Sequence, residues 1–345
     1  MQTQSTLVYH AADIDFAKPG KHHYQLAFHL DSSWGYSLLP ITVINGTAGG
    51  VSKVTGLAAF GGTHGNEYEG QIAIKRLCIS LNPEEMRGRV ILIPQLSESA
   101  CRSHTRSSPE DGVNMNRAFP GTASGTLSYR IAHVVKTRIL PQVKVVVDLH
   151  AGGKEAVFPL CTSFHPLPDA AQHEETARIA ALFDTPFIFV YSRQMASGLL
   201  VDEAENEGLI TIGGEFGHGE TTSIQGVEHA YEGVLNVMRH YDLLEGDVRR
   251  IDTERASRPR LVAAGDLKDY IPCPCDGIWE PAIAPGATVQ SGELVGRIHQ
   301  FEDHASEPRT VVAHKSGIAI ALYSAAVCHK GATLYVIGEE SPPKA

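Results

Sequence analysis

The sequence predicts an α/β fold in which a mostly parallel or mixed sheet carries helices on both faces, followed by a small all-β domain. Segments rich in valine, isoleucine and leucine alternate with segments whose apolar residues recur at helical spacing. The strand-like segments are almost continuously apolar, which is typical of a sheet covered on both faces. Beyond about residue 255 the helical pattern ends, and short β-prone runs alternate with Pro-Gly and Ser-Gly turns.

The elements of the α/β part follow one another in a regular order. A strand that ends at the turn Asn45-Gly46 comes first, and a second apolar run leads into a glycine-rich loop. A helix is expected after that loop. It would begin with Glu67 and Glu69, and acidic residues at this place stabilise a helix N-terminus. Strands are expected within 36–45, 51–62, 88–96, 143–150 and 209–217, and helices within 67–81, 127–142, 169–183 and 227–244.

The boundary between the two parts is expected near residue 255. The charged stretch EGDVRRIDTERASRPR has the character of a linker, so residues 1–255 would form the α/β domain and 256–345 the β domain. The segment GIWEPAIAPGATVQSGELVGRI resembles a barrel-sandwich domain of the lipoyl/biotinyl type. The corresponding hairpin, HQFEDHASEP, has no lysine to carry such a cofactor. We therefore expect this domain to wall the functional site.

The composition indicates a protein that works on small molecules. The chain has 345 residues and is 43% hydrophobic, enough for a sizeable core. With 29 Lys and Arg against 39 Asp and Glu, its net charge of -10 argues against unaided binding to nucleic acid or to an anionic membrane. No basic cluster precedes an apolar stretch at the N-terminus, and no run approaches the roughly 20 apolar residues that span a bilayer. We expect a cytoplasmic protein, for which homo-oligomerisation stays open.

A candidate metal site lies where buried strands give way to glycines. In GGTHGNEYEG, His64 and Glu67 are three residues apart between a predicted strand and helix, and ligands of open sheets bind at such strand ends. His150 closes the most apolar strand, in VKVVVDLHAGG, and is also followed by two glycines. A catalytic zinc takes three protein ligands and keeps one position open. We predict that these three residues bind one zinc per chain, with Asp148 orienting a ligand from behind.

Two further segments supply groups that hydrolysis would need. Hydrolysis requires a base for the attacking water and positive charge near the developing oxyanion. Glu215 ends another predicted strand, in LITIGGEFGHGE, where its carboxylate could face the metal pocket or belong to an ordinary loop. The polar loop SHTRSSPEDGVNMNRAFPG contains Arg106, Asn116 and Arg117. Arginine suits either the binding of a carboxylate or the polarisation of a carbonyl.

Together these motifs resemble the succinylglutamate desuccinylase/aspartoacylase family, a branch of the zinc carboxypeptidase-like hydrolases. THGNEYEG, NMNRAFPG, DLHAGG and GGEFG occur in the order typical of that family, and the resemblance covers about residues 35–245. The resemblance implies a zinc carboxypeptidase-like fold. It also implies that His64, Glu67 and His150 hold the zinc.

The same resemblance implies roles for the remaining candidates. Glu215 would be the general base and acid, Arg106 would polarise the scissile carbonyl, and Asn116 and Arg117 would grip the substrate carboxylate. One position departs from the usual Asp-x-Asn-Arg pattern, which begins here with Asn114. This variant, with WGYSLLPITVI and TRSSPEDG, is more similar to the Nα-acetyl-diaminobutyrate deacetylases of ectoine breakdown than to aspartoacylase.

The sequence thus predicts a zinc-dependent hydrolase of linear amide bonds, a deacylase that removes an acyl group from a small N-acyl amino acid. One alternative is a metallocarboxypeptidase that acts on short peptides. The other is a non-catalytic binding protein that has kept the pocket. A base at Glu215 argues against the latter.

Overall fold

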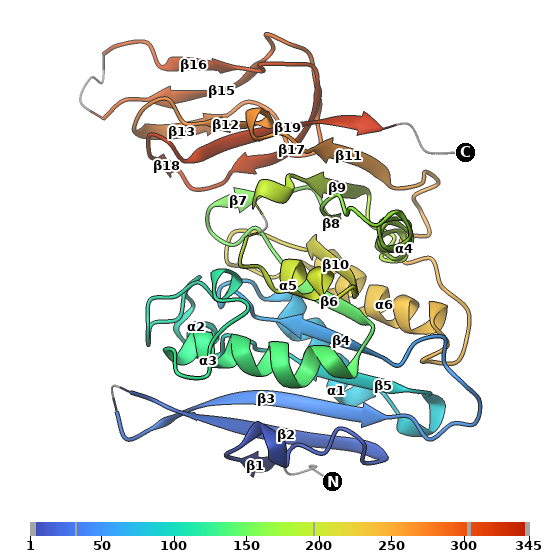
Figure 1. Cartoon of the computed structure of the whole chain (residues 1–345). Coiled ribbons are helices and arrows are strands. Elements are labelled where there is room, and N and C mark those ends of the chain that lie inside the picture. Colours follow the sequence, from blue (N-terminus) through green and yellow to red (C-terminus); the bar gives the residue numbers. More distant parts are fainter. Residues whose placement is uncertain (1–4, 32, 196, 302–304, 342–345) are drawn as a thin grey trace.

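The strands of the protein join into two sheets, shown in Figure 1 for the computed structural model, which describes residues 5–31, 33–195, 197–301 and 305–341. The larger, mixed sheet has 15 strands: β1 (Thr6–Val8), β2 (Gly20–His29), β3 (Tyr36–Asn45), β4 (Gly56–Gly61), β5 (Arg89–Ile93), β6 (Val145–His150), β7 (Ala156–Val157), β8 (Cys161–Phe164), β9 (Phe187–Tyr191), β10 (Ile210–Glu215), β11 (Arg260–Ala264), β12 (Tyr270–Pro272), β14 (Thr288–Val289), β17 (Gly317–Tyr323) and β19 (Thr333–Ser341). The smaller, antiparallel sheet has four: β13 (Gly277–Pro281), β15 (Leu294–His299), β16 (Arg309–Val312) and β18 (Val327–Cys328).

Parallel pairing dominates the middle of the larger sheet. The order there is β5-β4-β6-β10-β8-β9-β11, in which β5, β4, β6 and β10 run parallel and β8, β9 and β11 run parallel to one another. The two groups meet at an antiparallel pair, β10 with β8. On the far side of β5, β3 and β2 pair antiparallel as a hairpin. The predicted mixed α/β sheet is therefore confirmed.

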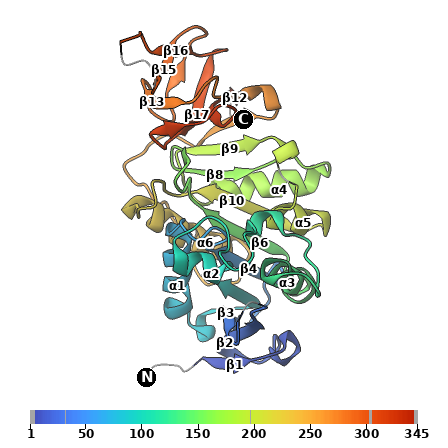
Figure 2. The ribbon, with the colours of Figure 1, turned by 90° about the vertical axis from the view of Figure 1, so that its left-hand side faces the viewer.

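Helices cover both faces of this sheet, as the side view in Figure 2 shows. The helices are α1 (Glu69–Ser80), α2 (Glu98–Ser103), α3 (Leu127–Val134), α4 (Ala170–Ala181), α5 (Leu200–Asn206) and α6 (Ile224–His240). Every predicted helix and strand is present, and the predicted helix 127–142 continues from α3 through a π turn and a 3-10 turn. Within the described ranges, no helix combines the length and apolar content needed to cross a bilayer.

Two hydrophobic cores explain why the central strands are continuously apolar. Successive side chains of a strand point to opposite faces of its sheet. In β4, Leu57 and Ala59 pack into the core that contains residues of α1, α4 and α6. Ala58 and Phe60 pack into the opposite core, with residues of α3 and α5. Each residue of β4 therefore loses its contact with water, whichever way it points.

The C-terminal part continues the larger sheet. After α6 the chain runs without helix or long strand until β11, consistent with the linker-like sequence there. β11 pairs parallel with β9 and antiparallel with β19, so backbone hydrogen bonds run from the α/β part into the C-terminal part. A second contact joins the two parts. β17 of the C-terminal part pairs antiparallel with β7, which lies in the loop region that follows β6. The stretch 299–308, compared above with a cofactor-bearing hairpin, lies partly outside the described residues.

Candidate active site

Three neighbouring parallel strands bring the main candidates to one edge of the sheet. β4, β6 and β10 lie side by side, and all three end at the same edge. His150 is the last residue of β6 and stands opposite Glu215, the last residue of β10. His64 follows three residues after the end of β4. Residues far apart in sequence therefore meet because parallel strands share a carboxyl edge.

Glycines let the loop after β4 approach β6 closely. Gly62 has φ of 64°, a left-handed conformation that glycine adopts readily. A Cβ on Gly70, in the first turn of α1, would lie 2.6 Å from the Cβ of Leu149. The missing side chain at Gly70 thus allows α1 to pack against the end of β6. This contact places the loop that contains His64 and Glu67 beside His150.

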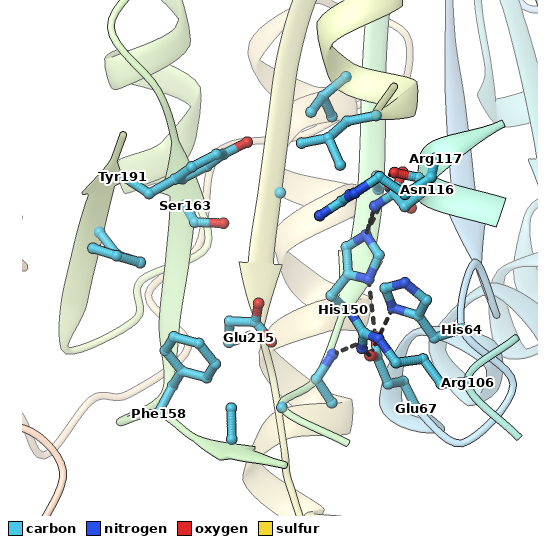
Figure 3. Close-up of a pocket in the computed structure, with 18 of the residues that line it drawn as sticks. His64, Glu67, Arg106, Asn116, Arg117, His150, Phe158, Ser163, Tyr191 and Glu215 are labelled. Carbon is cyan, nitrogen blue, oxygen red and sulfur yellow. Dashed lines mark hydrogen bonds and ion pairs between the residues drawn. The ribbon is translucent and has the colours of Figure 1, made fainter. Parts of the chain in front are cut away.

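The side chains of His64, Glu67 and His150 converge (Figure 3). His64 Nδ1 lies 2.7 Å from Glu67 Oε1, and His150 Nδ1 lies 2.8 Å from Glu67 Oε2. The ligand atoms of the three residues all lie within 4.8 Å of one another. His64 and Glu67 are buried, and His150 is nearly so. Two imidazole nitrogens and a carboxylate that point at a common position are a donor set for a divalent metal ion.

Opposite charges in this cluster stabilise Glu67 and His150, although burial lowers the pKa of His64. Burial alone would raise the pKa of Glu67, but the two histidines outweigh burial and hold that pKa well below its usual value. Burial lowers the pKa of His150, yet the carboxylates of Asp148 and Glu67 reverse the shift and hold the pKa well above its usual value. The cluster therefore stabilises a cation between its donors, and a metal ion bound there would replace the protons that these groups share.

Each histidine uses its other ring nitrogen to contact a second polar group. His150 Nε2 lies 2.8 Å from Asp148 Oδ2, and Thr63 Oγ1 donates to the other oxygen of Asp148. His64 Nε2 lies 3.1 Å from Asn114 Oδ1. Such partners fix the orientation of a histidine ring that binds a metal. The sequence singled out Asp148 for this position, whereas the contact of Asn114 with His64 was missed.

Glu215 faces the same cavity from β10 (Figure 3). Its Oε2 is buried and has no hydrogen-bond partner among the residues that the structure describes. Burial, reinforced by the negative charge of Glu67, raises the pKa of Glu215 to about 8. A buried carboxyl group with an unused oxygen and a pKa near neutrality is suited to exchanging a proton with a bound molecule. Glu215 is the last residue of β10 and lines the cavity, so it does not lie in a loop.

The polar loop before α3 brings its candidates to the cavity. Arg106 and Arg117 both line the cavity, and Arg106 Nη1 donates to Glu67 Oε1 over 3.1 Å. Arg117 Nη1 donates to the backbone oxygen of Asn116, and no carboxylate pairs with Arg117 within the described part of the chain. Asn116 also lines the cavity, but its Oδ1 accepts from Leu200 N and its Nδ2 lies 3.2 Å from His150 Nε2. Of the two arginines, Arg117 is therefore the better placed to bind an anionic ligand, because Arg106 is already paired with Glu67.

The rest of the cavity wall was missed from sequence. The cavity of about 260 Å³ is lined, besides the residues above, by Phe158, Ser163, Phe189, Tyr191, Leu199, Val201 and Tyr270. Most come from short strands and loops between the predicted elements, and Tyr270 comes from β12, beyond the linker. A single aromatic or hydroxyl residue in a short strand belongs to no recurring sequence pattern that would identify it as part of a cavity wall. The contribution of Tyr270 agrees with the expectation that the C-terminal part walls the site.

Comparisons with known proteins place this geometry among described relatives. A family model of the succinylglutamate desuccinylase/aspartoacylase catalytic domain matches residues 53–241. An N-alpha-acetyl-L-2,4-diaminobutyric acid deacetylase of Halomonas elongata is 30% identical over 334 residues, which cover 95% of this chain and 94% of the relative. The range that the family model matches includes the positions of His64, Glu67, Arg106, His150 and Glu215.

Solved structures with the same fold cover almost the whole chain. A succinylglutamate desuccinylase/aspartoacylase from Rhodobacter sphaeroides has a TM-score of 0.89 and 32% identity, covering 96% of this chain and 98% of that one. The product-bound ectoine utilization protein EutE (DoeB) from Ruegeria pomeroyi has a TM-score of 0.86 and 28% identity, covering 95% and 98%. The similarity therefore includes the C-terminal part as well as the α/β part.

Proposed function

Because the chain belongs to the succinylglutamate desuccinylase/aspartoacylase family, we propose that it is a zinc-dependent amidohydrolase that removes an acyl group from a small N-acyl amino acid in the cytoplasm. The observation that carries this proposal is the register of β6 and β10. It sets Glu215, with its unpartnered oxygen, beside the cluster of His64, Glu67 and His150. A metal-binding donor set next to a carboxyl group of raised pKa is the arrangement that metal-assisted amide hydrolysis requires.

We assign one zinc ion per chain to His64 Nδ1, Glu67 and His150 Nδ1, whose mutual distances suit a common ion. Zinc bound there would supply a Lewis acid for the amide carbonyl and lower the pKa of water. Asp148 and Asn114 hold the histidine rings in orientation through their second nitrogens.

The remaining residues divide the proton transfer and the charge stabilisation between them. Glu215 takes a proton from the water that attacks the acyl carbonyl, and then gives it to the nitrogen of the leaving amine. Arg106, at the cavity and beside Glu67, stabilises the negative charge that develops on the carbonyl oxygen. Arg117 binds the α-carboxylate of the amino acid, and Asn116 holds His150 and the start of α5 around it.

The carboxylate-binding role of Arg117 can be measured directly. We expect Arg117→Ala to raise KM for N-acyl amino acids by roughly 10- to 100-fold, since a charge-assisted hydrogen bond contributes about 1.5–3 kcal/mol. Substrates with an amidated carboxylate should be poor for the wild type and little changed in the variant. Arg102→Ala, at an exposed arginine that pairs with Glu98, is the matched control and should leave KM unchanged. Equal effects on both substrate types would assign Arg117 a structural role.

One experiment tests the proposed function against its alternatives. The purified protein, with its metal content measured, is offered N-acetyl, N-succinyl and longer N-acyl amino acids and short peptides, and the released amine is quantified. Turnover of the N-acyl amino acids supports the deacylase. Preferential cleavage of peptides would favour a metallocarboxypeptidase, and tight binding without turnover would favour a binding protein. The N-acetyl derivative of 2,4-diaminobutyrate belongs in the panel because of the Halomonas elongata relative.

We further propose that residues 1–255 form the catalytic domain and that residues 256–345, as a barrel-sandwich-like domain, complete the pocket. The pairing of β7 with β17 and the lining residue Tyr270 support this division of labour. Ser324, just after β17, also donates through Oγ to the backbone oxygen of Lys154 over 2.8 Å. The loop after His150 is therefore held between the two parts.

A further inference from the structure

A second polar cluster lies outside the proposed metal site and reaches the cavity through one side chain. His165, Asp202 and Glu205 form this cluster, in which His165 follows β8 and the two acids are three residues apart on α5. The side chains of His165 and Glu205 are 0% and 2% exposed. None of the three lines the cavity, but Tyr191, which does, contacts His165. These three ionisable side chains have no part in the mechanism above.

The contacts form a chain from the buried carboxylate to the cavity. Glu205 Oε2 lies 2.5 Å from His165 Nε2, and His165 Nδ1 lies 3.1 Å from the hydroxyl oxygen of Tyr191. Thr211 Oγ1 donates to the other oxygen of Glu205. The contact between Glu205 Oε2 and His165 Nε2 is an ion-pair distance without hydrogen-bond geometry, because neither of these two atoms has a hydrogen-bond partner among the described residues. Whichever of His165 and Tyr191 supplies the proton between them, the Tyr191 oxygen keeps a lone pair for a donor in the cavity.

Acidic side chains and Arg117 both act electrostatically on Tyr191. Burial, and then the charges of Glu205, Asp148 and Glu215, raise the pKa of Tyr191 well above its usual value. The hydroxyl of Ser163 points into the same space, and Figure 3 shows both residues on the wall opposite Arg117. An ammonium group placed there would find two hydroxyl acceptors with a buried carboxylate behind them. A methyl group would leave those acceptors unpaired.

We propose that Glu205, acting through His165 and Tyr191, is a specificity-determining group that selects substrates with a short, positively charged side chain. This inference rests on the proposed deacylase function. With the α-carboxylate at Arg117, the side chain of the amino acid extends toward Tyr191 and Ser163, and its ammonium group donates to their oxygens. His165 and Glu205 are positioning residues, because they hold the Tyr191 hydroxyl and supply the charge without touching the substrate.

Two isosteric substrates test the selection. N-acetyl-2,4-diaminobutyrate and N-acetylnorvaline differ only in the terminal group of the side chain, an ammonium in one and a methyl in the other. We expect kcat/KM of the wild type to be roughly 10- to 100-fold higher for the ammonium substrate, the factor that corresponds to one hydrogen bond to a charged group. Equal or reversed preference, with clear turnover of N-acetylnorvaline, would overturn the inference while leaving the deacylase function intact. Absence of turnover with every N-acyl amino acid would instead refute the proposed function.

Variants of Glu205 and Tyr191 test whether this chain of contacts causes the preference for the ammonium substrate. Glu205→Gln and Tyr191→Phe should each reduce the preference for the ammonium substrate, and the double variant should reduce it no further than either one. The matched control is Glu175→Gln, because Glu175 also contacts a histidine and a tyrosine, His240 and Tyr241, away from the cavity.

The outcomes distinguish the proposed role of Glu205 in substrate selection from a loss of structure and from binding of a second metal ion. Glu175→Gln should keep the wild-type preference, and all variants should unfold cooperatively. If Glu205→Gln proves unstable, Tyr191→Phe still decides the question, since it removes a single hydroxyl. A wild-type preference retained in folded Tyr191→Phe would overturn the inference. So would a second metal ion per chain that is lost in Glu205→Gln, because an ion at His165, Asp202 and Glu205 would neutralise the charge on which the selection depends.

Discussion

Replacing Glu215 by glutamine is expected to lower kcat by roughly 10²- to 10⁴-fold while the protein keeps its metal, because a general acid and base is lost. Glutamine has the shape of glutamate but cannot accept a proton from water and return it to an amine. Glu215 has a buried Oε2, faces the cavity and is not among the three residues that converge as ligands. KM should therefore change little. The measurements are steady-state kinetics and metal content by mass spectrometry.

A matched variant separates catalysis from burial of a charge. Glu69 is also buried, on α1, and its Oε1 accepts from the backbone nitrogen of Ser223 without lining the cavity. Glu69→Gln should leave kcat close to that of the wild type. A Glu215→Gln protein that is purified without metal and regains activity when zinc is supplied would show that Glu215 is a ligand instead of the base.

The site was predictable wherever a strand end carries a distinctive residue. His150 and Glu215 each follow an apolar run and precede glycines, and the rule that parallel strands share a carboxyl edge brings them together. His64 and Glu67 were found because glycines surround them in a loop between strand and helix. The spacing of the apolar residues predicted the alternating strands and helices on which these residues stand. The apolar spacing does not tell which strands are neighbours in the sheet. The structure shows that β6 lies between β4 and β10.

The specificity side of the pocket was not predictable, for a physical reason. Tyr191 and Ser163 lie in β9 and β8, short strands whose positions in the sheet depend on long-range pairing. The contact of His165 with Glu205 joins residues 40 apart in sequence, with no motif at either end. Tyr270 reaches the cavity only because β11 extends the sheet past the linker. Such contacts are set by tertiary packing, which local patterns do not encode.

Replacing His150 by alanine is expected to abolish activity and reduce the metal content from about one zinc per chain to near zero, since a catalytic zinc takes three protein ligands. His150 Nδ1 lies 2.8 Å from Glu67 Oε2 and faces the shared position, so its loss removes one of the three donors. Glu67→Gln should weaken metal binding less completely, because an amide oxygen still coordinates, and added zinc should restore part of its activity.

Asp148→Asn tests the same prediction with a smaller expected effect, because Asp148 contacts His150 Nε2 and not the position that the three donors share. Its loss should weaken metal affinity by roughly 10- to 100-fold, as expected for a residue that orients a ligand, and saturating zinc should recover most of the activity. The order of metal affinity should thus be wild type, then Asp148→Asn, then His150→Ala, as measured by competition with a chelator. Zinc retained at full stoichiometry in His150→Ala would remove that histidine from the ligand set. Because His150 is the histidine that contacts Glu67 Oε2, its removal takes one cationic partner from a buried carboxylate. Loss of metal and a lower melting temperature should therefore occur together in His150→Ala and less so in Asp148→Asn.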